Sequence, residues 1–247
     1  MSDAADTKIP GLTFAEDWPR VESAVGHDPG REAFIADVLS RMTLEEKVGQ
    51  MIQPDLREVT PDEITEYRLG TILNGGGAFP GNNKYATAAD WAETADIYYR
   101  ASERGYEGRG FRVPFAWATD AVHGHNNVFG ATLFPHNIGL GAARDPDLVR
   151  RIGSATAAEI TATGLDWTFA PTVAVPRDYR WGRVYEGYSE DPAVVHAYAS
   201  AMVDGLQGQG EERFGSGKVV STVKHWVGDG AHSTASTGAR TTTPRTT

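Results

Sequence analysis

The sequence of 247 residues contains no cysteine and no apolar stretch long enough to cross a membrane. It can therefore form neither disulfides nor thiolate metal sites, and it has no cysteine nucleophile. Basic residues are also scarce, with 23 Lys and Arg against 33 Asp and Glu, and this acidic balance argues against nucleic acid or an anionic membrane as a partner. The first twenty residues hold no apolar run of signal-peptide length, so the sequence as written indicates a cytoplasmic protein. A start further upstream would instead indicate a periplasmic or secreted one.

What the sequence does contain is a regular alternation of short apolar runs and helical patterns. Residues 1–30 show no periodicity and are interpreted as an N-terminal arm. Strands are predicted at 70–74, 115–118, 166–170 and 218–223. Helices are predicted at 31–42, after the capping-box motif at Thr43, after Thr60, at 87–104, from Asp145 to about Gly164, and from Pro192 to about Gln207. This order predicts a parallel α/β sheet, and we expect a (β/α)8 TIM-type barrel that is incomplete at its C-terminal end.

Polar side chains follow the predicted strands. Asp120 comes directly after the second strand, Arg183 lies in the long loop 177–191 after the third, and Lys224 and His225 follow the fourth. Because all βα loops of a barrel open on one face, we expect these four side chains to lie close together. A carboxylate that can accept hydrogen bonds from two neighbouring hydroxyls, surrounded by donors, suits a polyhydroxylated ligand.

Two other interpretations of these loops stay open at the level of sequence. His123 and His125, together with Asp120 and His136, could form a zinc or iron site of a metal-dependent barrel hydrolase, although structural histidines are commoner. The charged residues Glu186, Glu190 and Asp191 could simply form ion pairs with the nearby cations.

The three glycines at 75–77 could form either a tight loop or a phosphate cradle. A tight loop is expected, since no Gly-Lys-Ser/Thr follows them.

The tryptophans are expected in two kinds of position. Trp117 and Trp167 are expected in the core, whereas Trp181 and Trp226 are candidates for exposed faces that stack on sugar rings.

Several long motifs resemble one known family when they are taken together. They are residues 120–127, 130–137, 180–183, 188–192 and 224–230. In this order they resemble the N-terminal barrel of glycoside hydrolase family 3, most closely its bacterial β-glucosidase and exo-β-glucan glucohydrolase branch. The resemblance covers roughly residues 31–230. Because several long motifs match in the right order, the resemblance is specific to this family.

The resemblance implies an activity and four binding residues. The activity would be hydrolysis of terminal non-reducing β-D-glucosyl residues from β-glucoside or β-glucan oligosaccharides by a retaining mechanism, with no metal or other cofactor. Asp120 matches the family's sugar-binding carboxylate, and Arg183, Lys224 and His225 match donors that grip the hydroxyls of the glucosyl ring. Such hydrogen bonds would strengthen as the transition state forms.

No residue of this chain matches the family's catalytic carboxylates, so none is nominated as catalytic. The resemblance places the nucleophilic aspartate on a later strand and the acid/base glutamate beyond the barrel. A partial barrel leaves sheet edges unpaired, and we therefore expect the chain alone to be poorly stable and inactive. A non-catalytic sugar-binding remnant is the remaining alternative.

The segment 231–247 has an aberrant composition, since seven of its seventeen residues are Thr and none is apolar and larger than Ala or Pro. Such a segment has little to bury in a core. We hypothesise a one-base frameshift just after Gly230. Sequencing of the gene is expected to show a neighbouring frame that continues the family pattern, and an intact reading frame to Thr247 would refute the hypothesis.

Overall fold

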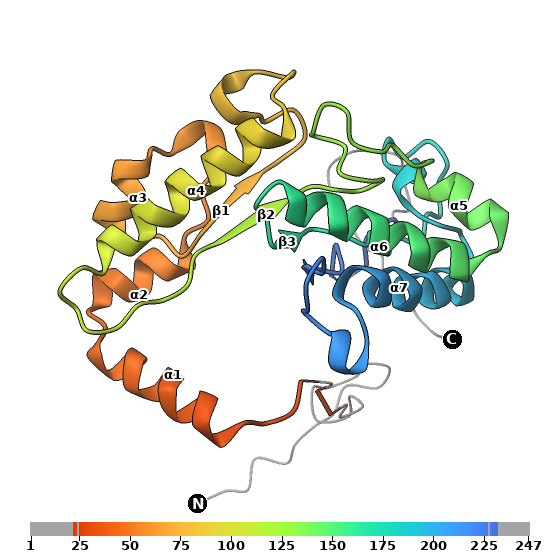
Figure 1. Cartoon of the computed structure of the whole chain (residues 1–247). Coiled ribbons are helices and arrows are strands. Elements are labelled where there is room, and N and C mark those ends of the chain that lie inside the picture. The colour runs from red at the N-terminus through yellow and green to blue at the C-terminus, as the bar shows by residue number, and fades with distance from the viewer. Residues whose placement is uncertain (1–21, 24, 227, 232–247) are drawn as a thin grey trace, which may run out of the picture.

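The structure is a computed structural model of the chain and describes residues 22–23, 25–226 and 228–231 (Figure 1). Its helices are α1 Pro29–Arg41, α2 Leu44–Met51, α3 Pro61–Tyr67, α4 Ala88–Gly105, α5 Asn137–Ala143, α6 Pro146–Ala162 and α7 Pro192–Gln207. Its strands are β1 Thr71–Asn74, β2 Ala116–Thr119, β3 Trp167–Thr168 and β4 Val220–Ser221. Short 3-10 turns occur at Leu56–Glu58, Pro80–Asn82, Val184–Glu186 and Gly210–Glu212. The tail 231–247, beyond its first residue, and most of the predicted arm 1–30 lie outside the described residues.

The four strands form one parallel sheet in the order β1-β2-β3-β4. Each strand is therefore a neighbour of the one before it in the chain. Because crossovers between parallel strands are right-handed in nearly all proteins, this sequential order keeps all connecting helices on the same face of the sheet. A doubly wound sheet would require the order to reverse. The predicted parallel α/β sheet is confirmed, and its order is that of a barrel wall.

The two faces of the sheet differ in burial. In Figure 1, α3 and α4 lie together at the left and α6 and α7 at the right. Trp117 of β2 packs on this helical layer, with its ring centroid 5.7 Å from that of Trp91 and 6.0 Å from that of Tyr98, both in α4. On the opposite face, Leu73 and Trp167 are only half-buried. The main hydrophobic core therefore lies between the sheet and its helices.

Polar side chains form a buried layer near the carboxyl ends of the first three strands. The Asn74 amide donates to Thr119 Oγ1 at 3.0 Å, and Thr168 Oγ1 donates to the Thr119 carbonyl at 3.1 Å. The Trp117 indole donates to Asn74 Oδ1 at 2.9 Å. Since buried polar groups are costly unless they are bonded, this satisfied layer favours one register of the strands beneath the polar loops.

Helix starts agree closely with the sequence prediction because side-chain caps mark them. Thr43, Thr60 and Thr87 each form a capping box with the acidic residue three positions later, and Asp145 and Asp191 cap α6 and α7. The strands β3 and β4 are shorter than predicted. Helix α5 was not predicted, because Pro135, Gly139 and Gly141 are poor helix formers.

Helix α1 was predicted with an apolar stripe, but only Val38 of that stripe is buried. Phe34 and Leu39 are about half exposed, and in the following helix Leu44 and Met51 are 73% and 85% exposed. We call these four residues the apolar α1–α2 surface. Three of them, Phe34, Leu39 and Met51, line a groove of about 510 Å³ between α1, α2 and the segment before β2. Within the described residues, no helix combines the length and the apolar character that a membrane span requires.

Two glycines in α5 give a matched test of the packing that holds the loop after β3. A Cβ atom on Gly141 would lie 1.6 Å from the carbonyl oxygen of the buried Tyr188, whereas a Cβ on Gly139 would meet only Pro135 Cβ at 3.6 Å. Gly141→Ala is expected to destabilise the fold by about 1–3 kcal/mol or more through overpacking. Gly139→Ala should be neutral or stabilise by up to about 1 kcal/mol. Urea unfolding of both variants checks this, and equal midpoints would contradict the described packing.

Candidate active site

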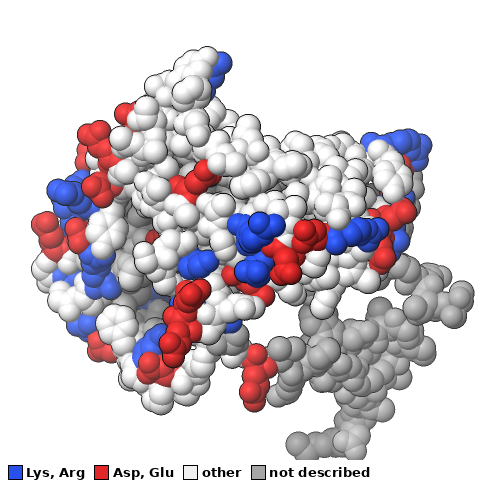
Figure 2. All heavy atoms as spheres, turned by 45° about the vertical axis from the view of Figure 1, so that its right-hand side comes forward, with Lys and Arg blue, Asp and Glu red and all other residues white. Residues whose placement is uncertain are grey.

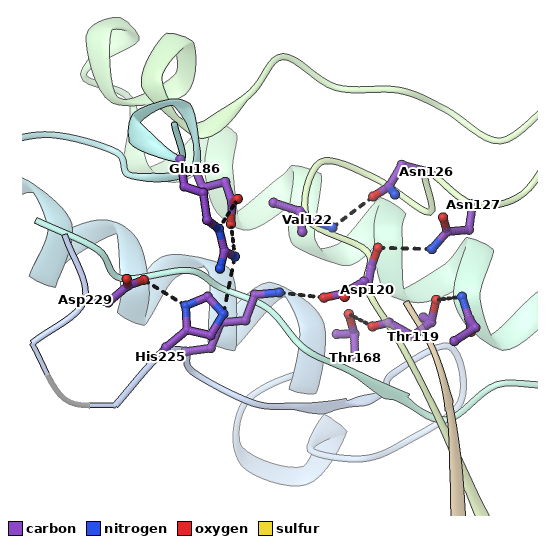
Figure 3. A network of polar contacts seen from close by, with 12 residues as sticks. Thr119, Asp120, Val122, Asn126, Asn127, Thr168, Glu186, His225 and Asp229 are labelled. Atoms are coloured by element: carbon purple, nitrogen blue, oxygen red, sulfur yellow. Dashed lines mark hydrogen bonds and ion pairs between the residues drawn. The ribbon is translucent and has the colours of Figure 1, made fainter. Parts of the chain in front are cut away.

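The loops that follow β1, β2, β3 and β4 meet at the carboxyl edge of the sheet (Figure 3). They surround a cavity of about 210 Å³ whose lining includes Asp120, His123, Arg183, Tyr185 and Lys224. Most of these groups are polar or charged, as expected for a site that binds a polar ligand. The strands set the positions of the side chains, because parallel strands bring their carboxyl ends to one edge.

An ion pair crosses this cavity. Lys224 Nζ donates to Asp120 Oδ1 at 2.5 Å, and the Lys224 side chain is only 12% exposed. Both backbones are also fixed, since the Asp120 amide donates to the Asn74 carbonyl and the Lys224 amide donates to the Pro171 carbonyl. The Asp120 carbonyl in turn accepts from the Asn127 side chain at 3.3 Å. The carboxylate and the ammonium group are therefore held in place by the protein itself.

A second charged group lies beside the first. The guanidinium of Arg183 donates two hydrogen bonds to the nearly buried Glu186 carboxylate, Nε to Oε1 at 2.6 Å and Nη2 to Oε2 at 2.7 Å. This bidentate contact raises the pKa of Arg183. Arg183 Nη2 also lies 3.4 Å from His225 Nε2, and His225 Nδ1 lies 2.8 Å from Asp229 Oδ2. Figure 3 shows these groups in one continuous chain of contacts.

Aromatic rings form another wall of the cavity. The centroids of His123 and His136 are 4.2 Å apart, and the Tyr185 ring meets His136 edge-on at 4.6 Å. His123 Nδ1 lies 3.0 Å from the Phe134 carbonyl oxygen, which fixes the ring. Burial, followed by the proximity of His123, lowers the pKa of His136, whereas the Glu186 charge opposes this shift. A neutral imidazole can both donate and accept hydrogen bonds at the cavity wall.

The four binding residues predicted from sequence come together in space. Asp120, Arg183 and Lys224 line the cavity, and His225 contacts Arg183. Their role in sugar binding stays a prediction. Of the acidic residues, Glu186 pairs with Arg183, Glu190 accepts from the Tyr179 hydroxyl at 2.8 Å, and Asp191 caps α7. All three are thus bonded within or next to the loop 177–191.

The glycine loop after β1 also has bonded amides. Gly75 N donates to Asp55 Oδ2 and Gly77 N donates to Asn127 Oδ1, both at 3.4 Å. These two backbone groups are therefore engaged by side chains of the protein. This agrees with the tight loop expected from sequence and not with a phosphate cradle.

The structure does not support the proposed metal site. His125 is fully buried, with Nε2 2.9 Å from Thr163 Oγ1, whereas His123 faces the cavity. Gly124, which lies between them at φ 95°, turns the chain so that the two imidazoles diverge. Among the residues that the structure describes, no three His, Asp or Glu side chains converge as metal ligands. His123 and His125 are thus not a ligand pair.

Two tryptophan predictions differ from the structure. Trp181 was expected to be exposed but is only 7% exposed, because the loop turns at Asp178 and places Trp181 inward while Arg180 faces solvent. Trp167 was expected in the core but is only half-buried. Trp226 is 76% exposed and Trp117 is buried in the core, both as predicted.

From the sequence, Glu186 was considered only as a possible ion-pair partner of the nearby cations, and Asp229 and Tyr185 were not considered as site residues. A signal was present for Glu186, because Arg and Glu three residues apart can meet in one helical turn. Val184–Glu186 forms such a 3-10 turn. Asp229 lies four residues after His225. That spacing predicts a contact only within a helix, and no helix was predicted there.

Charges of both signs share the face of the molecule that Figure 2 shows. Lys and Arg lie interspersed with Asp and Glu there, without a broad basic area on its described part. A nucleic-acid footprint would need such an area. The view therefore agrees with the acidic composition.

A profile of the glycosyl hydrolase family 3 N-terminal domain matches residues 43–247. The chain is 32% identical over 237 residues to the lysosomal beta glucosidase of Dictyostelium discoideum, covering 88% of this chain and 28% of that protein. It is also 32% identical over 220 residues to the periplasmic beta-glucosidase of Salmonella typhimurium, covering 85% of this chain and 26% of that protein.

Among solved structures, the fold is similar to the exo-1,3/1,4-beta-glucanase ExoP from a Pseudoalteromonas species. The TM-score is 0.83 and the sequence identity is 51%, over 88% of this chain and 27% of that one. The chain thus spans about a quarter of the length of these three relatives. Its parallel sheet corresponds to part of the barrel domain that they share.

The buried His125 makes stability depend on pH. Burial lowers the pKa of His125 from its ordinary value near 6.5 to about 4. Between these pH values the unfolded chain binds a proton that the folded chain does not, so stability is lost as pH falls. The loss is on the order of 3 kcal/mol. We expect His125→Gln to flatten the unfolding free energy over this range relative to the unchanged chain, as measured by urea titration at several pH values. The exposed His196→Gln is the control, and parallel profiles for all three proteins would contradict the assignment.

Proposed function

The chain belongs to glycosyl hydrolase family 3, whose N-terminal domain it matches, and we propose that it forms the glucosyl-binding part of a glycoside hydrolase. The proposed substrates are β-glucosides or β-glucan oligosaccharides, from which terminal non-reducing β-D-glucosyl residues are removed. The names of the relatives, beta-glucosidases and an exo-1,3/1,4-beta-glucanase, support this substrate class.

The observation that carries the proposal is the convergence of Asp120, Lys224 and Arg183 on one small polar cavity. A carboxylate has two oxygens and can accept hydrogen bonds from two adjacent sugar hydroxyls. The ammonium and guanidinium groups donate to hydroxyl oxygens on neighbouring carbons. A cavity of about 210 Å³ suits one sugar unit rather than a long chain, which agrees with removal of terminal residues.

These groups would act on the substrate by positioning it. Asp120 and Lys224 neutralise one another across the cavity, so a sugar replaces some of this contact by hydrogen bonds to its own hydroxyls. Contacts that are strongest when the ring flattens toward an oxocarbenium ion lower the barrier rather than only raising affinity. We assign this role to Asp120, Lys224 and Arg183.

The chemical step needs two further carboxyl groups about 5 Å apart, one as nucleophile and one as general acid/base. Glu186 lines the cavity and Asp229 lies behind His225, but Glu186 is bonded to the Arg183 guanidinium and Asp229 to His225. Neither is free for attack or proton transfer. We therefore propose that both catalytic carboxylates belong to the part of the relatives that this chain does not span, and that this chain alone does not hydrolyse glucosides.

Hydrolysis of an aryl β-D-glucoside tests the proposal. The chain as given is compared with a chimera in which its matched residues continue into the remaining part of the Pseudoalteromonas enzyme. Activity is expected only in the chimera. Activity of the short chain would mean that two of its own carboxylates catalyse the reaction, and an inactive but folded chimera would contradict the glucoside assignment. Calorimetry with glucose separates a sugar-binding fragment from one that does not bind.

In the same chimera, Asp120→Asn keeps the shape of the side chain but removes its charge. We expect kcat/KM to fall about a hundredfold, because the substitution replaces charge-assisted hydrogen bonds that stabilise the transition state by weaker neutral ones. Asp204→Asn is the control, since the Asp204 side chain accepts from Gln209 at the far end of α7 and lies outside the cavity lining. Equal losses in both variants would indicate a structural effect and not a binding role for Asp120.

A further inference from the structure

We propose that Asp229 is a positioning residue that holds His225 in the neutral tautomer with the proton on Nδ1. In this tautomer Nε2 offers a lone pair beside Arg183, which lines the cavity, and His225 acts as a hydrogen-bond acceptor. The resemblance had suggested a donor. The tautomer follows from the contacts alone, whereas the role of Nε2 toward a sugar hydroxyl rests on the proposed function.

The assignment depends on which partners can donate. Asp229 Oδ2 lies 2.8 Å from His225 Nδ1, and an ionised carboxylate can only accept. Nδ1 must therefore carry the proton. On the other side of the ring, Arg183 Nη2 lies 3.4 Å from Nε2, and a guanidinium can only donate. A proton on Nε2 would face another N–H group, so the two neighbours favour the same single tautomer.

Both partners of His225 are themselves held in place. The two hydrogen bonds that Arg183 donates to Glu186 fix the guanidinium plane, and the Glu186 carbonyl accepts from the buried Asn137 amide at 2.8 Å. Asp229 is fixed through its backbone, because Val175 N donates to the Asp229 carbonyl at 3.2 Å. The Asp229 side chain is only 14% exposed, so water competes weakly for the carboxylate. The imidazole thus lies between a fixed acceptor, the Asp229 carboxylate, and a fixed donor, the Arg183 guanidinium.

This arrangement places complementary groups side by side, since Arg183 lines the cavity and His225 lies next to it. Arg183 donates, and Nε2 of His225 accepts. A sugar hydroxyl that replaces the long 3.4 Å contact between these two groups can accept from the guanidinium and donate to the imidazole at the same time. Lys224, the residue before His225, supplies a second donor. Such a site binds a sugar hydroxyl, which both donates and accepts, more tightly than a methoxy or fluoro group, which can only accept.

Nitrogen-15 NMR of the histidine-labelled chain tests the tautomer directly, with no substrate added. The spectrum is recorded at low temperature and mildly alkaline pH, where imidazole is neutral. The His225 signals are assigned by their loss in His225→Gln. We expect the Nδ1-protonated pattern in the unchanged chain. In Asp229→Asn the tautomer ratio should shift about tenfold toward the Nε2-protonated form, the size expected for loss of a charge-assisted hydrogen bond.

Two matched variants separate positioning from a general structural effect. Asp204→Asn, which removes a carboxylate far from His225, should leave the ratio unchanged, and Asp229→Glu should retain part of the Nδ1-protonated form. The proposal is overturned if His225 is Nε2-protonated in the unchanged chain, or if Asp229→Asn leaves the ratio unaltered. Because no substrate is present, these outcomes do not depend on whether the chain acts on glucosides.

Discussion

The ion pair between Asp120 and Lys224 is the contact on which the arrangement of the site depends. It joins two loops that are 104 positions apart in the sequence. Neither loop could keep its partner in reach without the sheet, because the pair forms only where the ends of β2 and β4 are set by β3 between them. Burying two charges costs hydration free energy. A partly buried ion pair of this kind is therefore stabilising only if the surrounding protein holds both groups in good geometry. Here the backbone hydrogen bonds on both sides supply that support.

The protein itself therefore organises the site. Its cations and carboxylates are matched with one another, Lys224 with Asp120 and Arg183 with Glu186. Such matching reduces the entropy that a ligand would lose by ordering long side chains. It also means that a ligand in this cavity gains only the difference between its own hydrogen bonds and those it replaces.

Much of the fold was readable from sequence because its signals are local. Threonine and aspartate caps marked the helix starts, and Asp120, Arg183 and Lys224 could be placed together because parallel strands end on one edge. The predictions that were wrong concern features that depend on tertiary contacts. The inward direction of Trp181 depends on how its loop folds back, and the separation of His123 from His125 depends on one glycine with positive φ. Helix α5 forms against low propensity because it packs on Tyr188.

The exposed apolar α1–α2 surface affects how the chain behaves in solution. Its side chains include Met51, which is 85% exposed, and the net charge of -10 provides the repulsion that keeps molecules apart. Salt screens that repulsion, and sulfate also strengthens contacts between apolar groups. The chain should consequently salt out early, and more readily in sulfate than in a salt whose anion is less strongly excluded from the protein surface.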